Sequence, residues 1–187
     1  LTIKIPQTSG YSKVITSDDY FYSYLSLEAN SRSRNKAKNI VLFWDASMSM
    51  KDRLFEKEAA ILDSYFKHLV DVNVKVVQFS NDIISEKWYT VEDGQWPMLK
   101  EDLKNTVYDG GTSYTCLLEQ YSADEFLIFT DGMKNLSELK TPTATPIFVI
   151  NSLLQANHSE LVSICEASNG KYLNLKSISS DEAFEDL

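Results

Sequence analysis

The chain has 187 residues, a formal net charge of -9 and 43% hydrophobic residues, which suits one domain with a small addition. Its acidity argues against a protein that binds along a nucleic acid backbone, because such a protein needs clustered Lys and Arg. No run approaches the ~20 apolar residues of a membrane span, and no leader peptide is recognisable. Cys116 and Cys165 lack CxxC spacing, so a zinc site or a disulfide framework is not expected.

The first 38 residues differ in character from the rest. "LTIKIP" and "DYFYSYLSLEA" have the alternation and aromatic content of strands, "PQTSGYS" between them is turn material, and "NSRSRNKAKN" is a basic connector. We therefore expect an N-terminal β segment and connector over 1–38, either the tail of a preceding β domain or an edge of the main one. The chain begins at Leu1 rather than Met, so other domains of a longer parent chain are expected.

From Asn39 onward, predicted strands alternate with predicted helices. Apolar runs indicate buried strands, and apolar residues at helical spacing indicate amphipathic helices. The predicted strands are "NIVLFWD", "VNVKVVQFS", "SEKWYTV", "EFLIFTDG", "TPIFVINS" and "KYLNL". The predicted helices are "KDRLFEKEAAILDSYFKHLV" (beginning near Ser49), "WPMLKEDLKNTV", "YTCLLEQYS", "SELVSICEASNG" and "SDEAFEDL". This order predicts an α/β domain over 39–187, doubly wound, with a mostly parallel central sheet flanked by helices.

Oxygen-bearing side chains gather where the strands of this sheet end. Each segment alone is an ordinary helix cap, loop or turn, but the three occur in fixed order at strand ends or in an adjoining loop. Ligands of open α/β sheets bind at this edge, and an all-oxygen set suits Mg²⁺, Mn²⁺ or Ca²⁺ rather than zinc or copper. The set is Asp45, Ser47, Ser49, then Thr112 after Gly110 and Gly111, then Asp131 before Gly132.

These motifs, "DASMS", "GGTS" and "FTDG", resemble the metal-ion-dependent adhesion site of the von Willebrand factor type A (vWA) family. The resemblance covers 39–187 and implies a Rossmann-like fold and a non-enzymatic adhesion or assembly module. It implies that Ser47, Ser49 and Thr112 contact a metal, Mg²⁺ with Mn²⁺ or Ca²⁺ as alternatives, and that Asp45 and Asp131 act directly or through water. A partner protein would then supply an Asp or Glu. The expected second shell or rim is Met48, where many members have Gly, with Asp109, Gly110, Gly111 and Gly132.

The preceding stretch "SDDYFYSYLSLEA" is similar to the segment that joins an inter-α-trypsin-type (VIT) domain to a type A domain. In bacteria, such paired domains often belong to envelope proteins. The resemblance therefore implies the soluble part of a membrane-anchored or cell-envelope protein.

Two other interpretations stay open at this stage. The domain could be an assembly scaffold whose site stays empty. It could also be a Mg²⁺-dependent phosphatase of the haloacid dehalogenase type, with Asp45 as nucleophile after an apolar strand. That chemistry calls for a second acid two residues later, where this chain has Ser47. We assign no catalytic residue.

Overall fold

The computed structural model describes residues 12–17, 20–25, 35–114, 118–133, 144–185 and 187, and the chain divides into two units, 1–35 and 36–187. In the first unit, β1 (Ser12–Ser17) pairs antiparallel with β2 (Tyr20–Leu25). The second strand was predicted, whereas the predicted strand at 1–6 lies outside the described residues. The strand at Ser12–Ser17 was missed because its apolar residues, Val14 and Ile15, are adjacent rather than alternating. The assignment of 1–38 to a β segment and connector stays a prediction.

The second unit is built on a six-stranded sheet in the order β5-β4-β3-β6-β7-β8. Every neighbouring pair is parallel except β4 and β5, which confirms the mostly parallel sheet. The strands are β3 (Asn39–Asp45), β4 (Val72–Phe79), β5 (Ile83–Val91), β6 (Glu125–Phe129), β7 (Ile147–Asn151) and β8 (Tyr172–Asn174).

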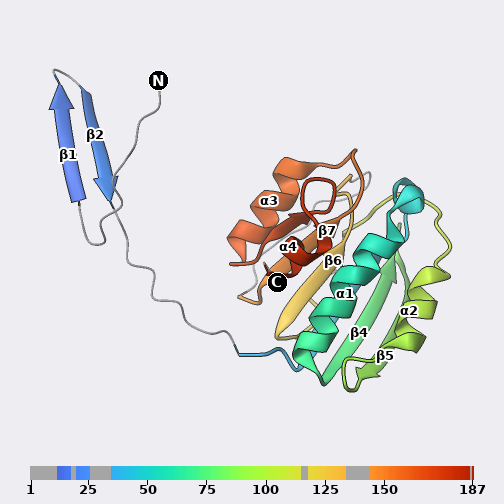
Figure 1. The fold of residues 1–187 in the computed structure, drawn as a ribbon. Coiled ribbons are helices and arrows are strands. Elements are labelled where there is room, and N and C mark those ends of the chain that lie inside the picture. The colour runs from blue at the N-terminus through green and yellow to red at the C-terminus, as the bar shows by residue number, and fades with distance from the viewer. Residues whose placement is uncertain (1–11, 18–19, 26–34, 115–117, 134–143, 186) are drawn as a thin grey trace. The chain divides into compact units, whose positions relative to one another are not determined.

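Helices cover both faces of this sheet, as predicted for a doubly wound fold (Figure 1). The helices are α1 (Phe55–Leu69), α2 (Pro97–Lys104), α3 (His158–Ala167) and α4 (Ser180–Glu185). Alternate residues of the central strands enter opposite cores. Ile40, Leu42 and Trp44 pack with α1, α2 and α4, whereas Val41 and Phe43 pack with α3. Since these strands are covered on both faces, their sequences read as continuous apolar runs.

The segment after β3 differs from the prediction of one helix from near Ser49. A 3-10 turn, η1 (Met48–Asp52), comes first, and α1 begins only at Phe55. The break falls at Arg53, whose backbone is extended (ψ 147°) and whose side chain turns inward to bond the strand ends. The predicted short helix "YTCLLEQYS" lies partly outside the described residues, and its described residues 118–120 form a turn.

The strand order creates the position for a site. From β3 the chain passes through α1 to β4 on one side of β3, and later returns to β6 on the other side. In an open α/β sheet, ligands bind at the carboxyl ends of strands where the order reverses in this way. Trp44 lies opposite Phe129 in the register of β3 and β6, so the residues that follow each strand emerge side by side.

Candidate metal-binding site

Asp45 is the last residue of β3, and its carboxylate is completely buried. Oδ1 accepts a hydrogen bond from the backbone N–H of Ser47 at 2.9 Å, and Oδ2 accepts one from Thr130 Oγ1 at 2.6 Å. The two bonds fix the carboxylate plane from both sides. Burial raises the pKa of Asp45 above its ordinary value of 3.8, and the nearby charge of Asp131 adds to the rise, while the bonds from Ser47 and Thr130 oppose it.

Ser47 and Ser49 follow Asp45 at alternate positions, and the structure brings their hydroxyls together. Ser47 Oγ lies 3.2 Å from Ser49 Oγ; Ser47 is buried, whereas Ser49 is exposed. Met48 between them is 51% exposed and is not among the described non-glycine residues with positive φ. Methionine at a position where many vWA members have glycine therefore requires no strained backbone, and its side chain lies at the surface.

Thr112 is the most informative residue of the set. It is completely buried, and its Oγ1 is one of only two buried side-chain N or O atoms without a hydrogen-bond partner among the described residues. Leaving a buried hydroxyl without a partner is unfavourable, so native proteins seldom do so without a functional reason. A cation bound beside this oxygen would be such a partner.

Asp131 follows β6 and is also buried. Its Oδ1 accepts a hydrogen bond from the Met133 N–H at 2.8 Å, and its backbone carbonyl accepts one from the Asn157 N–H just before α3. Gly132 has φ +70°, a conformation that L side chains rarely adopt, so the chain can turn sharply at the edge. The carboxylate is thereby held at the same edge as Asp45.

The loop between α2 and Thr112 is joined to the end of β3 by main-chain hydrogen bonds. Asp109 N–H donates to the Ala46 carbonyl at 2.9 Å, and Met48 N–H donates to the Gly110 carbonyl at 3.0 Å. The Asp109 carboxylate accepts from its neighbour Gly110, as a turn residue would. Gly111 N–H donates to Asn81 Oδ1 at 2.7 Å, which ties the loop to the segment after β4. The predicted rim residues Met48, Asp109 and Gly110 thus connect the first two of the three motifs through backbone contacts.

Thr130 is a site residue that sequence reasoning missed. Because its single hydroxyl proton goes to Asp45, its oxygen accepts from Tyr114 Oη at 2.8 Å and from the Gly132 N–H at 3.2 Å. Burial first, and then the charge of Asp45, raise the pKa of the Tyr114 hydroxyl far above its ordinary range, so Tyr114 remains a donor. The signal was available, since Thr130 directly precedes Asp131, but a threonine ending an apolar strand is unremarkable by itself.

The donor set fits a hard divalent cation. The set predicted from the sequence contains two carboxylates and three serine or threonine hydroxyls, all oxygen. Within the described ranges, no group of three or more His, Cys, Asp and Glu side chains is placed to hold a metal. By its chemistry, a set of carboxylates and hydroxyls suits Mg²⁺, Mn²⁺ or Ca²⁺ rather than zinc or copper. Of the proposed ligands, Asp45 and Ser47 are bonded to each other, Ser47 contacts Ser49, and Asp131 acts on the pKa of Asp45. Their role as metal ligands stays a prediction.

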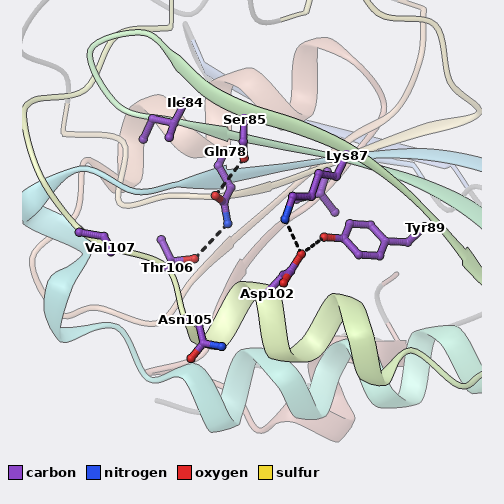
Figure 2. Close-up of a pocket in the computed structure, with 10 residues that line it drawn as sticks. Gln78, Ile84, Ser85, Lys87, Tyr89, Asp102, Asn105, Thr106 and Val107 are labelled. Carbon is purple, nitrogen blue, oxygen red and sulfur yellow. Dashed lines mark hydrogen bonds and ion pairs between the residues drawn. The ribbon is translucent and has the colours of Figure 1, made fainter.

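A separate recess of about 280 Å³ lies between β4, β5 and α2 (Figure 2). Its polar side chains bond one another: Lys87 Nζ and Tyr89 Oη both donate to Asp102, and Gln78 lies between Ser85 and Thr106. These groups close a network between sheet and helix rather than facing inward unpaired. The recess does not include the oxygen ligands at the ends of β3 and β6.

Comparison with known proteins gives a fold and not a near relative. No family model and no curated protein matches the sequence. A vWA protein from Catenulispora acidiphila matches at 18% identity and a TM-score of 0.55, over 80% of this chain and 40% of that protein. An aerotolerance-related membrane protein from Bacteroides fragilis matches at 13% identity and 0.55, over 79% and 95% of the two chains.

Manganese-loaded TRAP protein from Plasmodium vivax matches at 15% identity and a TM-score of 0.50, over 80% of this chain and 71% of that one. None of the helices in the described ranges is both long and apolar enough to cross a membrane. The parallel sheet, its strand order and these matches agree with the resemblance carried by the three motifs. The chain therefore has the fold of a von Willebrand factor type A domain.

Proposed function

We propose that this domain is a non-enzymatic protein-binding module that holds a divalent cation at the ends of β3 and β6. Asp45, Ser47, Ser49, Thr112 and Asp131 would hold the cation, directly or through water. The bound ion would supply an electrophilic site for a carboxylate, and the partner protein would provide that carboxylate from an Asp or Glu. The buried and unpartnered hydroxyl of Thr112 is the observation that supports this most directly.

Charge and ligand type support Mg²⁺ first, with Mn²⁺ or Ca²⁺ as alternatives. Two carboxylates roughly neutralise a divalent ion, whereas hydroxyls are neutral and weak ligands, so the ion keeps its attraction for a further anion. The manganese in the matching Plasmodium vivax protein is consistent with a divalent ion in this fold. The Asp45 carboxylate, whose pKa is raised by burial, would gain a counter-charge from the ion.

The two alternative functions, phosphatase and empty scaffold, can be compared at Ser47 and Thr112. A phosphatase of the haloacid dehalogenase type would need an acid at position 47, and the serine there contacts Ser49. A scaffold with an empty site would gain nothing from an unpartnered buried hydroxyl at Thr112. The phosphatase lacks the acid that it needs at position 47, and the empty scaffold does not account for Thr112, so the binding module is the function that we favour.

The test is calorimetric titration of Mg²⁺ and then Mn²⁺ into the metal-stripped protein. Asp45→Ala should abolish saturable binding, whereas Asp63→Ala, which removes a carboxylate between α1 and α2, should leave it unchanged. Acetate would then probe the coordination position that we assign to the partner's carboxylate. When the protein is loaded with Mn²⁺, acetate should displace water from the ion and so lower the enhancement of water-proton relaxation. No binding in the unsubstituted protein would favour the scaffold, and equal binding in Asp45→Ala would place the ion elsewhere.

Two further proposals concern the longer protein to which this domain would belong. We propose that residues 1–38 are the tail of a preceding β domain of the VIT type. We propose further that the vWA-like domain belongs to the part of a membrane-anchored or envelope protein that lies outside the bilayer. One matching structure comes from a membrane protein, which agrees with this. Fractionation of cells that express the full-length protein would test it, because the proposal requires the protein to be recovered with the membranes.

A further inference from the structure

Beneath the candidate site lies a buried ion pair that joins the strand ends. Arg53 Nη1 donates to the backbone carbonyl of Asp45 at 2.9 Å, and Nη2 makes a longer contact of 3.5 Å to the carbonyl of Phe129. These two carbonyls belong to the last residues of β3 and β6; Asp45 is itself the last residue of β3, and Asp131 follows β6 by two residues. One guanidinium thus contacts both ligand-bearing strands at their carboxyl ends.

Glu58, in the first turn of α1, completes the connection. Its Oε2 accepts from Arg53 Nε at 2.7 Å, and its Oε1 accepts from Ser152 Oγ at 2.7 Å. Ser152 directly follows β7, and its hydroxyl also accepts from the Leu54 N–H at 2.9 Å. The pair therefore links the ends of three adjacent strands, β3, β6 and β7, to the beginning of α1.

The surroundings of the pair exclude water. The Arg53 side chain is 2% exposed and the Glu58 side chain 0% exposed, and the guanidinium lies 3.5 Å from the centre of the Trp44 ring. A buried ion pair is weak evidence for stability, because apolar residues of similar volume often stabilise a fold equally well. Its better attested use is to select one arrangement of the groups that it bonds.

We propose that Arg53 and Glu58 are positioning residues, which set the separation of Asp45 and Asp131 and so preform the cation site. This inference rests on the proposed function. Mg²⁺ demands near-ideal octahedral geometry at short distances, whereas Ca²⁺ accepts larger and more flexible sites. Loosening the strand ends should therefore weaken Mg²⁺ binding much more than Ca²⁺ binding. A residue that served only stability would leave this ratio unchanged.

The experiment uses the 187-residue chain with Arg53→Met and Glu58→Leu combined, so that no unpaired buried charge remains. A control removes an exposed ion pair between α1 and α2 with Lys100→Met and Asp63→Asn, which keeps an acceptor for Trp96. We expect the first double variant to lose at least about tenfold in Mg²⁺ affinity and clearly less in Ca²⁺ affinity. The control should match the unsubstituted protein for both ions.

Arg53→Lys separates position from charge. A lysine keeps the positive charge, but its three N–H donors lie on a single nitrogen. It therefore cannot reach the three acceptors that Arg53 contacts from three separate nitrogens. We expect it to lose Mg²⁺ selectivity like the double variant. Unchanged selectivity in both variants would overturn the inference, and full selectivity in Arg53→Lys alone would show that charge, not position, matters.

Amide hydrogen exchange in metal-free protein tests the positioning independently of metal binding. Ala46 N–H donates to the Phe79 carbonyl and Thr130 N–H to the Ile150 carbonyl, just where the strands end. In the Arg53→Met/Glu58→Leu variant both amides should exchange at least about tenfold faster, with the mid-strand amide of Val74 unchanged. Failure of the unsubstituted chain to bind any metal would refute the proposed function alone, whereas unchanged exchange at both amides would refute the positioning role.

Discussion

Replacing Thr112 by valine should stabilise the metal-free protein and weaken its binding of metal. Valine has nearly the shape of threonine but puts a methyl group where the hydroxyl lies. In the metal-free protein that hydroxyl is completely buried and has no hydrogen-bond partner among the described residues, so the folded state bears the cost of its desolvation. Valine removes the cost without creating a cavity. In the metal-bound protein the same change removes a proposed ligand.

The size of the effect follows from the value of an unmade hydrogen bond. Leaving a buried donor or acceptor unsatisfied costs about 1–3 kcal/mol, and apolar replacement recovers part of it. We therefore expect Thr112→Val to raise the free energy of unfolding by roughly 1–2 kcal/mol in chelator. For a unit of this size, each kcal/mol shifts Tm by about 2–4 °C, so a rise of roughly 2–8 °C is expected.

The matched control is Thr130→Val, the same chemical change at another buried threonine of the site. Thr130 Oγ1 donates to Asp45 at 2.6 Å and lies 2.8 Å from Tyr114 Oη. Its removal leaves those groups unsatisfied, so this variant should lose about 1–3 kcal/mol. The assay is urea and thermal unfolding of both variants in EDTA, and then in saturating Mg²⁺, beside calorimetric titration. If Thr112→Val lost as much stability as Thr130→Val in EDTA, or bound Mg²⁺ with unchanged affinity, the reasoning would be refuted.

Three further predictions concern pH, backbone and thiol chemistry. Because burial raises the pKa of Asp45 above 3.8, the folded metal-free protein keeps a proton there after the unfolded chain has lost it. The free energy of unfolding should thus fall as pH rises through that window. Asp45→Asn should remove this fall in urea titrations with EDTA, and an identical slope in both proteins would contradict the shift. Gly132→Ala should destabilise the protein by about 1–3 kcal/mol, since φ is +70° and the new Cβ would lie 2.7 Å from Leu161 Cδ2. A melting temperature within about 1 °C of that of the unsubstituted protein would contradict this prediction. Cys165 is a free, buried thiol, and burial raises its pKa to about 12, so iodoacetamide at pH 8 should label it only after unfolding, as peptide mass spectrometry would show.

Much of the fold could be predicted from the chain because its signals are local. Continuous apolar runs identify β3, β6 and β7 as strands covered on both faces, and every residue of β6 and β7 is buried. The order of acid and hydroxyls after β3, and of the acid after β6, places oxygen ligands at one sheet edge once the strands are parallel. Hydrophobic spacing likewise located α1 and α3, although it did not show that α1 begins only at Phe55.

What the sequence determined by itself was the α/β class, the strands of the six-stranded sheet and the candidate ligand set. Only the tertiary structure decided which groups support that set. Thr130 reaches Asp45 across 85 residues, and Ser152 reaches Glu58 across 94, because register and crossing helices bring them together. Nor does any local pattern state that Thr112 has no partner or that Arg53 turns inward, since both depend on what the rest of the fold places around them. Local periodicity encodes which residues are buried, whereas contacts between distant residues exist only after the strands have paired.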